Sequence, residues 1–311
     1  MSTRITLPNT DLQVYPLCLG GNVFGWTADQ EQSFRVLDTH RELDGNFVDT
    51  ADVYSEWVPG NEGGESEKVI GAWMKARGSR AETVVATKVA KLSTRPGLSA
   101  ANIVAACEDS LRRLQTDYID LYYAHEDDAS VPLEESLGAF DKLVQQGKIR
   151  FAAASNYSGA RLTEAQQIAK TNHLRGYVAL QNQYNLMERE EFENDSEPAL
   201  DSLGLSALPY FSLAMGFLSG KYQPGVQVDS SRAGGVAGYQ NERGWAVVSE
   251  LAAIATETSS TSSAVALAWL RAQPGVSTPI ASARTVEQLR EIVPIVELSG
   301  AQVARLTSAS N

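Results

Sequence analysis

Four side chains that can hold or transfer a proton follow consecutive β-prone runs of the chain. Asp49 ends the second run and Tyr54 lies in the next loop, whereas Lys88 ends the third run and His125 the fourth. An isolated charge inside a protein is very costly, so Asp49 and Lys88 are expected to neutralise one another. A cationic Lys88 should favour ionisation of a neighbouring phenol and lower the pKa of Tyr54 from about 10. The set predicts proton donation to a substrate oxygen that His125 also orients.

Each member of this set also has a structural interpretation. Asp49 and Lys88 alone could be a structural ion pair, and a single His125 is more often a core histidine. Metal ligation is not favoured, because His40 and His173 fall in helical stretches and no HExxH spacing occurs. A Schiff-base aldolase is an alternative, since Lys88 could be a nucleophile, but a salt-bridged ammonium is a poor one. Acid–base chemistry is preferred because the four residues lie at or beside successive strand ends.

The elements that must position these residues alternate between short β-prone runs and amphipathic helical stretches. One such stretch, 132–146, places Leu133, Leu137 and Phe140 on a single helical stripe. Eight alternating units predict an α/β protein built as a closed (β/α)8 TIM barrel. The eight β-prone runs are 15–20, 46–50, 83–88, 118–125, 149–155, 177–181, 206–212 and 276–283.

Further polar side chains follow the later runs, and in a barrel the carboxyl ends of all strands meet at one mouth. An open dinucleotide-binding sheet is less favoured, because 19–25 reads LGGNVFG and lacks the GxGxxG spacing. Residues 4–14 contain the turn signal Asn-Thr-Asp and predict a β-hairpin at the barrel bottom. The Gly- and Ser-rich stretch 223–238 predicts a mobile loop. The polar residues at the later strand ends are Ser155, Asn156, Gln181, Ser212, Ser282 and Arg284.

Composition narrows the class of protein without identifying a reaction. The 311 residues are 43% hydrophobic and 21% charged, and no linker divides them, so residues 1–311 are expected to form a single domain. The net charge of −12 argues against nucleic-acid binding, which needs a cationic surface. Cys18 and Cys107 lack CxxC spacing, and no apolar run suits a secretory signal or a membrane span. A cytoplasmic protein without a membrane partner is expected, and its oligomeric state is open.

Five segments resemble the aldo-keto reductase family in their residues and in their order. The first contains Asp49 and Tyr54, the next two contain Lys88 and His125, and the last two resemble the segments that hold the nicotinamide. The resemblance extends from about residue 17 to residue 289. The segments read NFVDTADVY at 46–54, ATK at 86–88, DYIDLYYAH at 117–125, IRFAAASNY at 149–157 and QNQYN at 181–185.

The resemblance implies a tetrad of Asp49, Tyr54, Lys88 and His125 on a (β/α)8 barrel. It implies an NAD(P)H-dependent oxidoreductase that reversibly reduces the aldehyde or ketone group of a small molecule to an alcohol. A hydride would pass from the nicotinamide to the carbonyl carbon while Tyr54 donates the proton. Channel-associated proteins of the family keep the barrel and the tetrad, so a cofactor-binding regulatory subunit with little turnover is the alternative.

The resemblance also implies a set of cofactor contacts. The nicotinamide would lie against polar side chains of the fifth and sixth strand ends, and Phe211 would stack on it where the family usually has tyrosine. Arg284 would bind the 2′-phosphate, which favours NADPH over NADH, with NADH as the alternative. The implied contacts are Gly21, Asn22, Asp49, Ser155, Asn156, Gln181, Phe211, Ser212, Leu213, Gly216, Leu218, Lys221, Ser282, Arg284 and Gln288.

Aromatic residues are expected to form the walls of a substrate pocket. Trp26, Tyr54, Trp57 and His125 would give an opening suited to a carbonyl compound with a hydrophobic body. The acidic residues 126–128 that follow His125 would disfavour anionic substrates. Equally, they could form an ordinary solvated loop.

Overall fold

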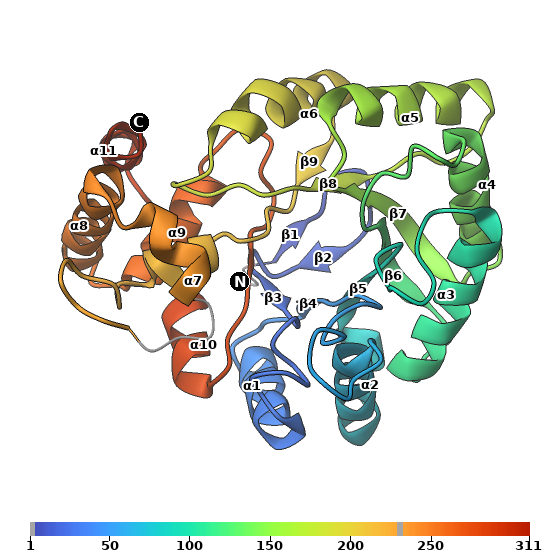
Figure 1. The fold of residues 1–311 in the computed structure, drawn as a ribbon, viewed down its shortest axis with the longest axis horizontal. Coiled ribbons are helices and arrows are strands. Elements are labelled where there is room, and N and C mark those ends of the chain that lie inside the picture. The colour runs from blue at the N-terminus through green and yellow to red at the C-terminus, as the bar shows by residue number, and fades with distance from the viewer. Residues whose placement is uncertain (1–3, 229–232) are drawn as a thin grey trace.

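The computed structural model describes residues 4–228 and 233–311 of the chain. Eight parallel strands pair in the order β10-β3-β4-β5-β6-β7-β8-β9, and helices lie on the outside of the strands (Figure 1). Each strand overlaps one of the eight β-prone runs. The strands are β3 (Cys18–Gly20), β4 (Phe47–Asp49), β5 (Val84–Val89), β6 (Ile119–Ala124), β7 (Ile149–Ser155), β8 (Ala179–Gln181), β9 (Ser206–Ala207) and β10 (Ile280–Ala281).

The ring of strands closes between β9 and the segment that leads into β10. The Ala207 amide donates to the Gly275 oxygen at 2.7 Å, and the Ile280 amide donates to the Pro209 oxygen at 2.9 Å. Pro209 and Pro279 have no N–H to donate, which limits regular pairing at this junction. These hydrogen bonds complete the sheet, and the predicted (β/α)8 barrel is confirmed.

At least one helix follows each barrel strand, and capping residues determine where several of them begin. Asp29, Ser99 and Ser158 each accept a hydrogen bond from the first turn of the helix that follows. The predicted stripe of Leu133 and Leu137 is buried on α4. The helices are α1 (Gln30–Glu42), α2 (Glu65–Arg77), α3 (Ala100–Leu114), α4 (Leu133–Gln145), α5 (Gly159–Thr171), α6 (Glu197–Leu203), α8 (Glu242–Glu257), α9 (Ser262–Arg271), α10 (Val286–Ile292) and α11 (Gly300–Ala309).

Short helices occupy the connection between β9 and α8. They are η3 (Ala214–Ser219), α7 (Ala233–Val236) and η4 (Ala237–Tyr239). Inside η3 the chain kinks, because Met215 and Gly216 have φ values of 56° and 96°. The predicted loop at 223–238 therefore contains helical turns, and its residues 229–232 lie outside the described residues.

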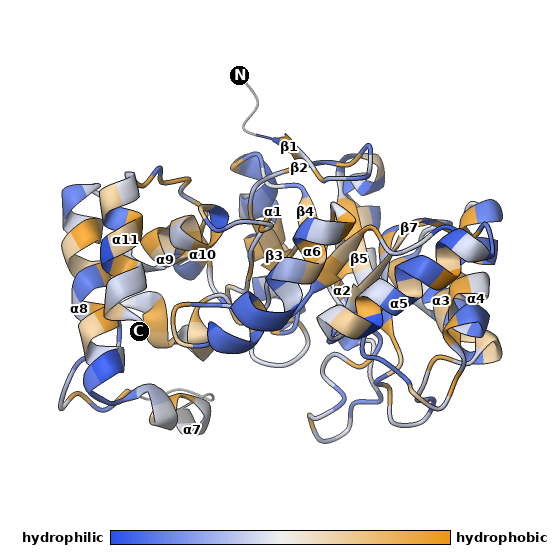
Figure 2. Ribbon diagram, turned by 90° about the horizontal axis from the view of Figure 1, so that it is seen from above, coloured by the Kyte–Doolittle hydropathy of each residue, from blue (hydrophilic) through white to orange (hydrophobic). Residues whose placement is uncertain are grey.

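A two-stranded hairpin precedes the barrel and covers one end of it. β1 (Ile5–Thr6) pairs antiparallel with β2 (Gln13–Val14), and Asn9 in the turn has a φ of 60°. Leu7 and Leu12 are fully or almost fully buried in one cluster with side chains from the barrel strands. Figure 2 shows the hairpin at one end of the barrel and α7 at the opposite end. The expected hairpin at the barrel bottom is confirmed, and the carboxyl ends of the strands face the other end.

Candidate active site

The carboxyl ends of β4 and β5 place a lysine–aspartate ion pair inside the barrel. Lys88 Nζ lies 2.6 Å from Asp49 Oδ2 and 2.7 Å from the backbone oxygen of Thr50. Both charged side chains are enclosed, with Lys88 0% and Asp49 2% exposed. Lys88 Nζ also donates to the Tyr54 hydroxyl at 3.2 Å, so all three ammonium hydrogens have acceptors. The predicted pairing of the two charges is confirmed.

Tyr54 projects from the loop after β4 toward the same ammonium. Its hydroxyl donates to Asp49 Oδ2 at 3.3 Å, and its half-buried ring lines a cavity. Burial of this phenol, followed by the negative charge of Asp49, raises the pKa of Tyr54 well above its ordinary value. The expectation that Lys88 lowers this pKa is therefore wrong, because Asp49 offsets the ammonium charge and desolvation adds to its effect. At neutral pH the phenol keeps its proton.

His125 follows β6 and meets Tyr54 edge to face, with 6.2 Å between the ring centroids. Its backbone amide donates to the Val89 oxygen at 2.8 Å, which fixes the end of β6 against β5. Burial, followed by the charges of Lys88 and Lys91, lowers the pKa of His125 well below its ordinary value. Within the described part of the chain, Nδ1 is buried without a hydrogen-bond partner. A neutral imidazole carries one donor and one acceptor, so it can donate to an oxygen near the Tyr54 hydroxyl.

Polar side chains at the ends of β7 and β8 connect to this set. Gln181 Nε2 donates to Asp49 Oδ1 at 3.0 Å, and Ser155 Oγ donates to the Gln181 backbone oxygen at 2.8 Å. Asn156 has a φ of 56°, a left-handed conformation in which asparagine is enriched. Its Nδ2 donates to the His125 backbone oxygen at 2.8 Å. The side chains predicted to hold a nicotinamide thus lie in one hydrogen-bonded network with the four residues predicted to handle the proton.

These residues line a cavity of about 380 Å³ at the carboxyl ends of the strands. The cavity brings together residues that are far apart in the sequence, such as Asn22 and Ser282, which are 260 positions apart and whose side chains are hydrogen-bonded at 2.6 Å. The predicted site residues that line it are Asn22, Asp49, Tyr54, Trp57, His125, Ser155, Asn156, Gln181, Phe211, Ser212, Leu213, Gly216 and Ser282.

A second cavity of about 530 Å³ adjoins the first. Leu213, Met215, Gly216 and Ser282 line both, so the two cavities form one elongated cleft along η3. The second cavity is also lined by three further residues that were predicted to contact a cofactor, Lys221, Arg284 and Gln288. Its lining carries two cationic side chains and a single carboxylate, Glu291, among the described residues, although the whole chain has a net charge of −12.

Other predicted site residues lie close to the cleft without lining it. The Gly21 amide donates to the Asp49 backbone oxygen at 2.7 Å, and Leu218 is completely buried. Trp26 packs edge to face on Trp57, with 5.6 Å between ring centroids. Lys88 is completely buried, and its ammonium is hydrogen-bonded to Asp49 and Tyr54, which line the cavity. Contacts of Gly21, Leu218 and Trp26 with a ligand stay predictions.

The cleft also contains residues that sequence reasoning missed. Lys91 and Tyr210 line the smaller cavity, and the Tyr210 hydroxyl donates to Asn156 Oδ1 at 2.8 Å. Lys91 lies three residues beyond the predicted run 83–88, and Tyr210 lies two residues before the end of the run 206–212. Nearness to a strand end was the available signal. Met215, at the kink in η3, lines both cavities.

The acidic residues after His125 have partners of their own. Glu126 forms an ion pair with Lys91 at 3.3 Å, and Asp127 forms one with Arg161 at 2.9 Å. Asp128 accepts a hydrogen bond from the Leu98 amide at 2.9 Å. None of the three carboxylates is among the described residues that line the cleft. The structure favours the interpretation of this segment as an ordinary polar loop.

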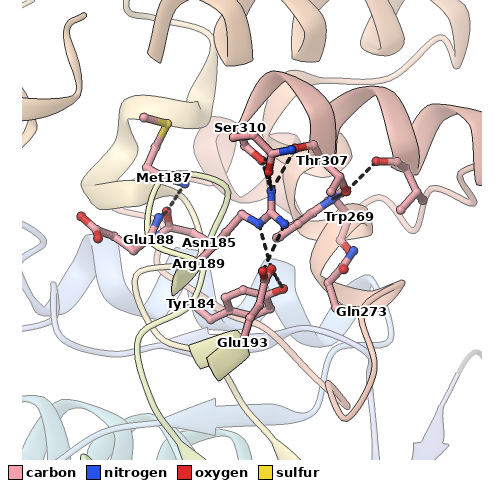
Figure 3. A network of polar contacts seen from close by, with 12 residues as sticks. Tyr184, Asn185, Met187, Glu188, Arg189, Glu193, Trp269, Gln273, Thr307 and Ser310 are labelled. Atoms are coloured by element: carbon pink, nitrogen blue, oxygen red, sulfur yellow. Dashed lines mark hydrogen bonds and ion pairs between the residues drawn. The ribbon is translucent and has the colours of Figure 1, made fainter. Parts of the chain in front are cut away.

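An arginine network supports the loop after β8. Arg189 Nε lies 2.8 Å from Glu193 Oε1, and Arg189 Nη1 donates to the Thr307 backbone oxygen at 2.9 Å (Figure 3). These contacts tie the loop to α11 at the end of the chain. Asn185 in the same loop donates to the Phe211 backbone oxygen at 3.0 Å. The carboxyl-terminal helix therefore helps to position Phe211 at the cleft.

Other parts of the described structure offer less to a small ligand. A wider cavity of about 1080 Å³ lies beside α3 and contains none of the predicted site residues. Its Arg95 and Arg112 both form ion pairs with Asp109. Across the described residues there is no cluster of three or more His, Cys, Asp or Glu side chains that could hold a metal ion. None of the described helices combines the length and the apolar character needed to span a membrane.

Comparison with known proteins agrees with this architecture. The model of the aldo/keto reductase family matches residues 16–311. An uncharacterized oxidoreductase, YrpG, from Bacillus subtilis is 35% identical over 302 residues, which cover 94% of this chain and 90% of that protein. Norsolorinic acid reductase A from Aspergillus parasiticus is 30% identical, over 95% of this chain and 77% of that protein.

A relative of another kind is also similar over nearly the whole chain. A putative voltage-gated potassium channel subunit beta from Schizosaccharomyces pombe is 34% identical over 310 residues, which cover 94% of this chain and 87% of that protein. The family match spans all eight barrel strands and the four residues predicted to form a tetrad. On these grounds the chain belongs to the aldo/keto reductase family.

Proposed function

We propose that this protein reduces aldehyde or ketone groups to alcohols with a nicotinamide cofactor, using Tyr54 as the proton donor. The observation that carries the proposal is the 3.2 Å contact between the Tyr54 hydroxyl and Lys88 Nζ, beside a cavity that His125 also lines. Two side chains that can donate a proton thus face the position that a carbonyl oxygen would take. The family and its oxidoreductase relatives support the general class of reaction.

The cleft fits an elongated cofactor that bears phosphate groups. Its two parts, of about 380 and 530 Å³, are each of a size usual for ligand sites. Ser155, Asn156 and Gln181 offer hydroxyl and amide groups that match a carboxamide at one end. Lys221 and Arg284 offer positive charge for phosphate groups at the other end. A reduced nicotinamide, when bound, supplies the hydride, and Arg284 supports NADPH over NADH.

The side chains of the tetrad divide the handling of the proton. Tyr54 stays protonated at neutral pH because burial and Asp49 raise its pKa. Its proton passes to the carbonyl oxygen as negative charge develops there. The Lys88 ammonium, 3.2 Å away, then stabilises the phenolate. Asp49 and the Thr50 backbone oxygen hold that ammonium in place, and neutral His125 donates a hydrogen bond to the same substrate oxygen.

The proposal is tested by steady-state kinetics with a panel of aldehydes and ketones and with both nicotinamide cofactors. Tyr54→Phe should lower kcat/KM by about 10²- to 10⁴-fold, the usual contribution of a general acid. Binding of NADPH, followed by fluorescence titration, should stay close to that of the unchanged protein. Tyr118→Phe, a tyrosine at the opposite end of β6, is the matched control and should retain turnover. Turnover near the unchanged level in Tyr54→Phe would remove Tyr54 from the role.

A regulatory subunit that binds the cofactor with little turnover is the second candidate. Three relatives from a fission yeast and two plants are named as voltage-gated potassium channel β subunits, and they favour this candidate. It predicts tight NADPH binding together with slow or absent reduction across the whole carbonyl panel. Rapid reduction that Tyr54→Phe abolishes would decide for the enzyme.

A further inference from the structure

Lys91 brings a positive charge to the cavity in which the proposed reduction takes place. It lies two residues beyond the end of β5 (Val84–Val89), and it lines the same cavity as Tyr54, Trp57 and His125. The ammonium of Lys91 is one of the causes of the lowered pKa of His125. The charge of Lys91 therefore acts at the reacting groups as well as at the protein surface.

The ion pair between Lys91 and Glu126 leaves this charge available to a ligand. Their charged atoms are 3.3 Å apart, and the side chains are 34% and 47% exposed. Ion pairs with this exposure contribute little to stability, because water screens both charges. An ammonium has three N–H donors, so a second carboxylate can bind to Lys91 beside Glu126 or replace it.

Among the described residues that line the cavity, no uncommitted carboxylate is available to Lys91. Asp49 is the sole carboxylate among the described residues that line it. One Asp49 oxygen accepts from Lys88 and Tyr54, and the other accepts from Gln181. The lining thus presents a positive charge although the chain as a whole has a net charge of −12.

An aromatic wall lies in the same cavity as this ammonium. Trp57 is 49% exposed, and its ring meets Trp26 and Tyr54 edge to face at centroid distances of 5.6 and 6.2 Å. Its remaining exposed surface can pack against a flat apolar body. A ligand that combines a ring with an anionic group would use both the tryptophan and the lysine.

We propose that the site prefers aromatic aldehydes and ketones that carry a carboxylate, and that Lys91 binds this carboxylate while Tyr54 and His125 bind the carbonyl oxygen. The inference rests on the proposed function and specifies its substrate class. It assigns Lys91 a part in specificity, whereas proton transfer stays with the tetrad. Since Glu126 competes for Lys91, it weakens this preference.

The test compares formylbenzoates with their methyl esters, which have the same ring and aldehyde without the charge. The ortho, meta and para isomers are assayed with NADPH, and the readout is the ratio of kcat/KM for acid and ester within each protein. Lys91→Met should lower the ratio about tenfold for the best isomer, which corresponds to about 1.4 kcal/mol. The change should appear in KM rather than kcat. Glu126→Gln should raise the ratio, and added salt should lower it in the unchanged protein.

Lys68→Met is the matched control, because Lys68 forms an ion pair with Glu65 at 3.4 Å and lines the wider cavity beside α3 rather than the cleft. Its acid-to-ester ratio should equal that of the unchanged protein. The inference would be overturned if Lys91→Met left the ratio unaltered for all three isomers, or if Lys68→Met lowered the ratio equally. In that case reduction of the esters would still support the proposed function. If the unchanged protein reduced neither the acids nor the esters, that result would instead contradict the proposed function itself.

Discussion

Asp52 is a buried carboxyl group whose charge should make stability fall as pH rises. It is 1% exposed, and neither of its carboxyl oxygens has a hydrogen-bond partner among the described residues. Burial, followed by the negative charge of Glu67, raises its pKa from 3.8 to about 7. Arg113 and the Val53 amide oppose this shift, although the amide does not complete a hydrogen bond.

The sign and size of the effect follow from the two pKa values. Because the folded-state pKa lies above the unfolded value of 3.8, the folded chain keeps a proton between about pH 4 and 7 that the unfolded chain has lost. The free energy of unfolding therefore decreases with rising pH across this window and levels off above pH 7. The whole difference corresponds to about 4 kcal/mol, of which about 2 kcal/mol is lost between pH 5.5 and 8.5.

Asp52→Asn removes the titrating group and should remove this part of the pH dependence. Urea unfolding of the variant and of the unchanged protein is measured at pH 5.5, 7.0 and 8.5, and the difference in free energy of unfolding is taken at each pH. That difference should shift in favour of Asn by about 2 kcal/mol from the lowest to the highest pH. Using a difference cancels other titrating groups, and any fixed cost of the buried amide drops out of the trend.

Asp117→Asn, at an exposed carboxyl group, serves as the control for the aspartate-to-asparagine substitution itself. A difference for Asp52→Asn that stays constant from pH 5.5 to 8.5 would refute the reasoning. It would mean that Asp52 ionises in the folded protein as readily as in the unfolded chain. In that case Arg113, or water reaching the carboxyl group, would offset its burial.

The other predictions concern the cofactor cleft and the packing of the helices. Arg284→Leu should raise the Kd for NADPH about tenfold, through loss of a charge-assisted contact, and leave NADH binding nearly unchanged in a fluorescence titration; equal losses for both cofactors would contradict the assignment. Gly71→Ala should lower the free energy of unfolding by about 1–3 kcal/mol, because the new Cβ would lie 2.3 Å from the Arg113 backbone oxygen. Gly138→Ala is its control, since a Cβ at that position of α4 would enter open space among the described residues, and it should raise stability by about 0.5–1 kcal/mol. Similar effects of the two substitutions on urea unfolding would rule out the packing explanation.

Local sequence signals were sufficient for the fold and for the place of the site. The residue patterns of β-prone and helical stretches repeat over a few neighbouring positions, so the sequence alone predicts the eight strands in their order along the chain. Strand ends such as Asp49, Lys88 and Gln181 were assigned to one mouth, because parallel barrel strands all end on the same side. The carboxyl end of β9, near Pro209, could not be predicted exactly, since strand pairing depends on a partner strand far along the chain.

The tertiary structure decided the properties that depend on burial and on partners distant in the sequence. The direction of the Tyr54 pKa shift depends on how far Asp49 offsets Lys88 and on how deeply the phenol is desolvated, and neither is local in sequence. The contact from Gln181 to Asp49 joins residues 132 positions apart. Only the folded structure places Lys91 in the cavity. The sequence by itself determined which groups gather at the barrel mouth, and folding determined their charge states and the space between them, because electrostatic and packing energies depend on distances in three dimensions.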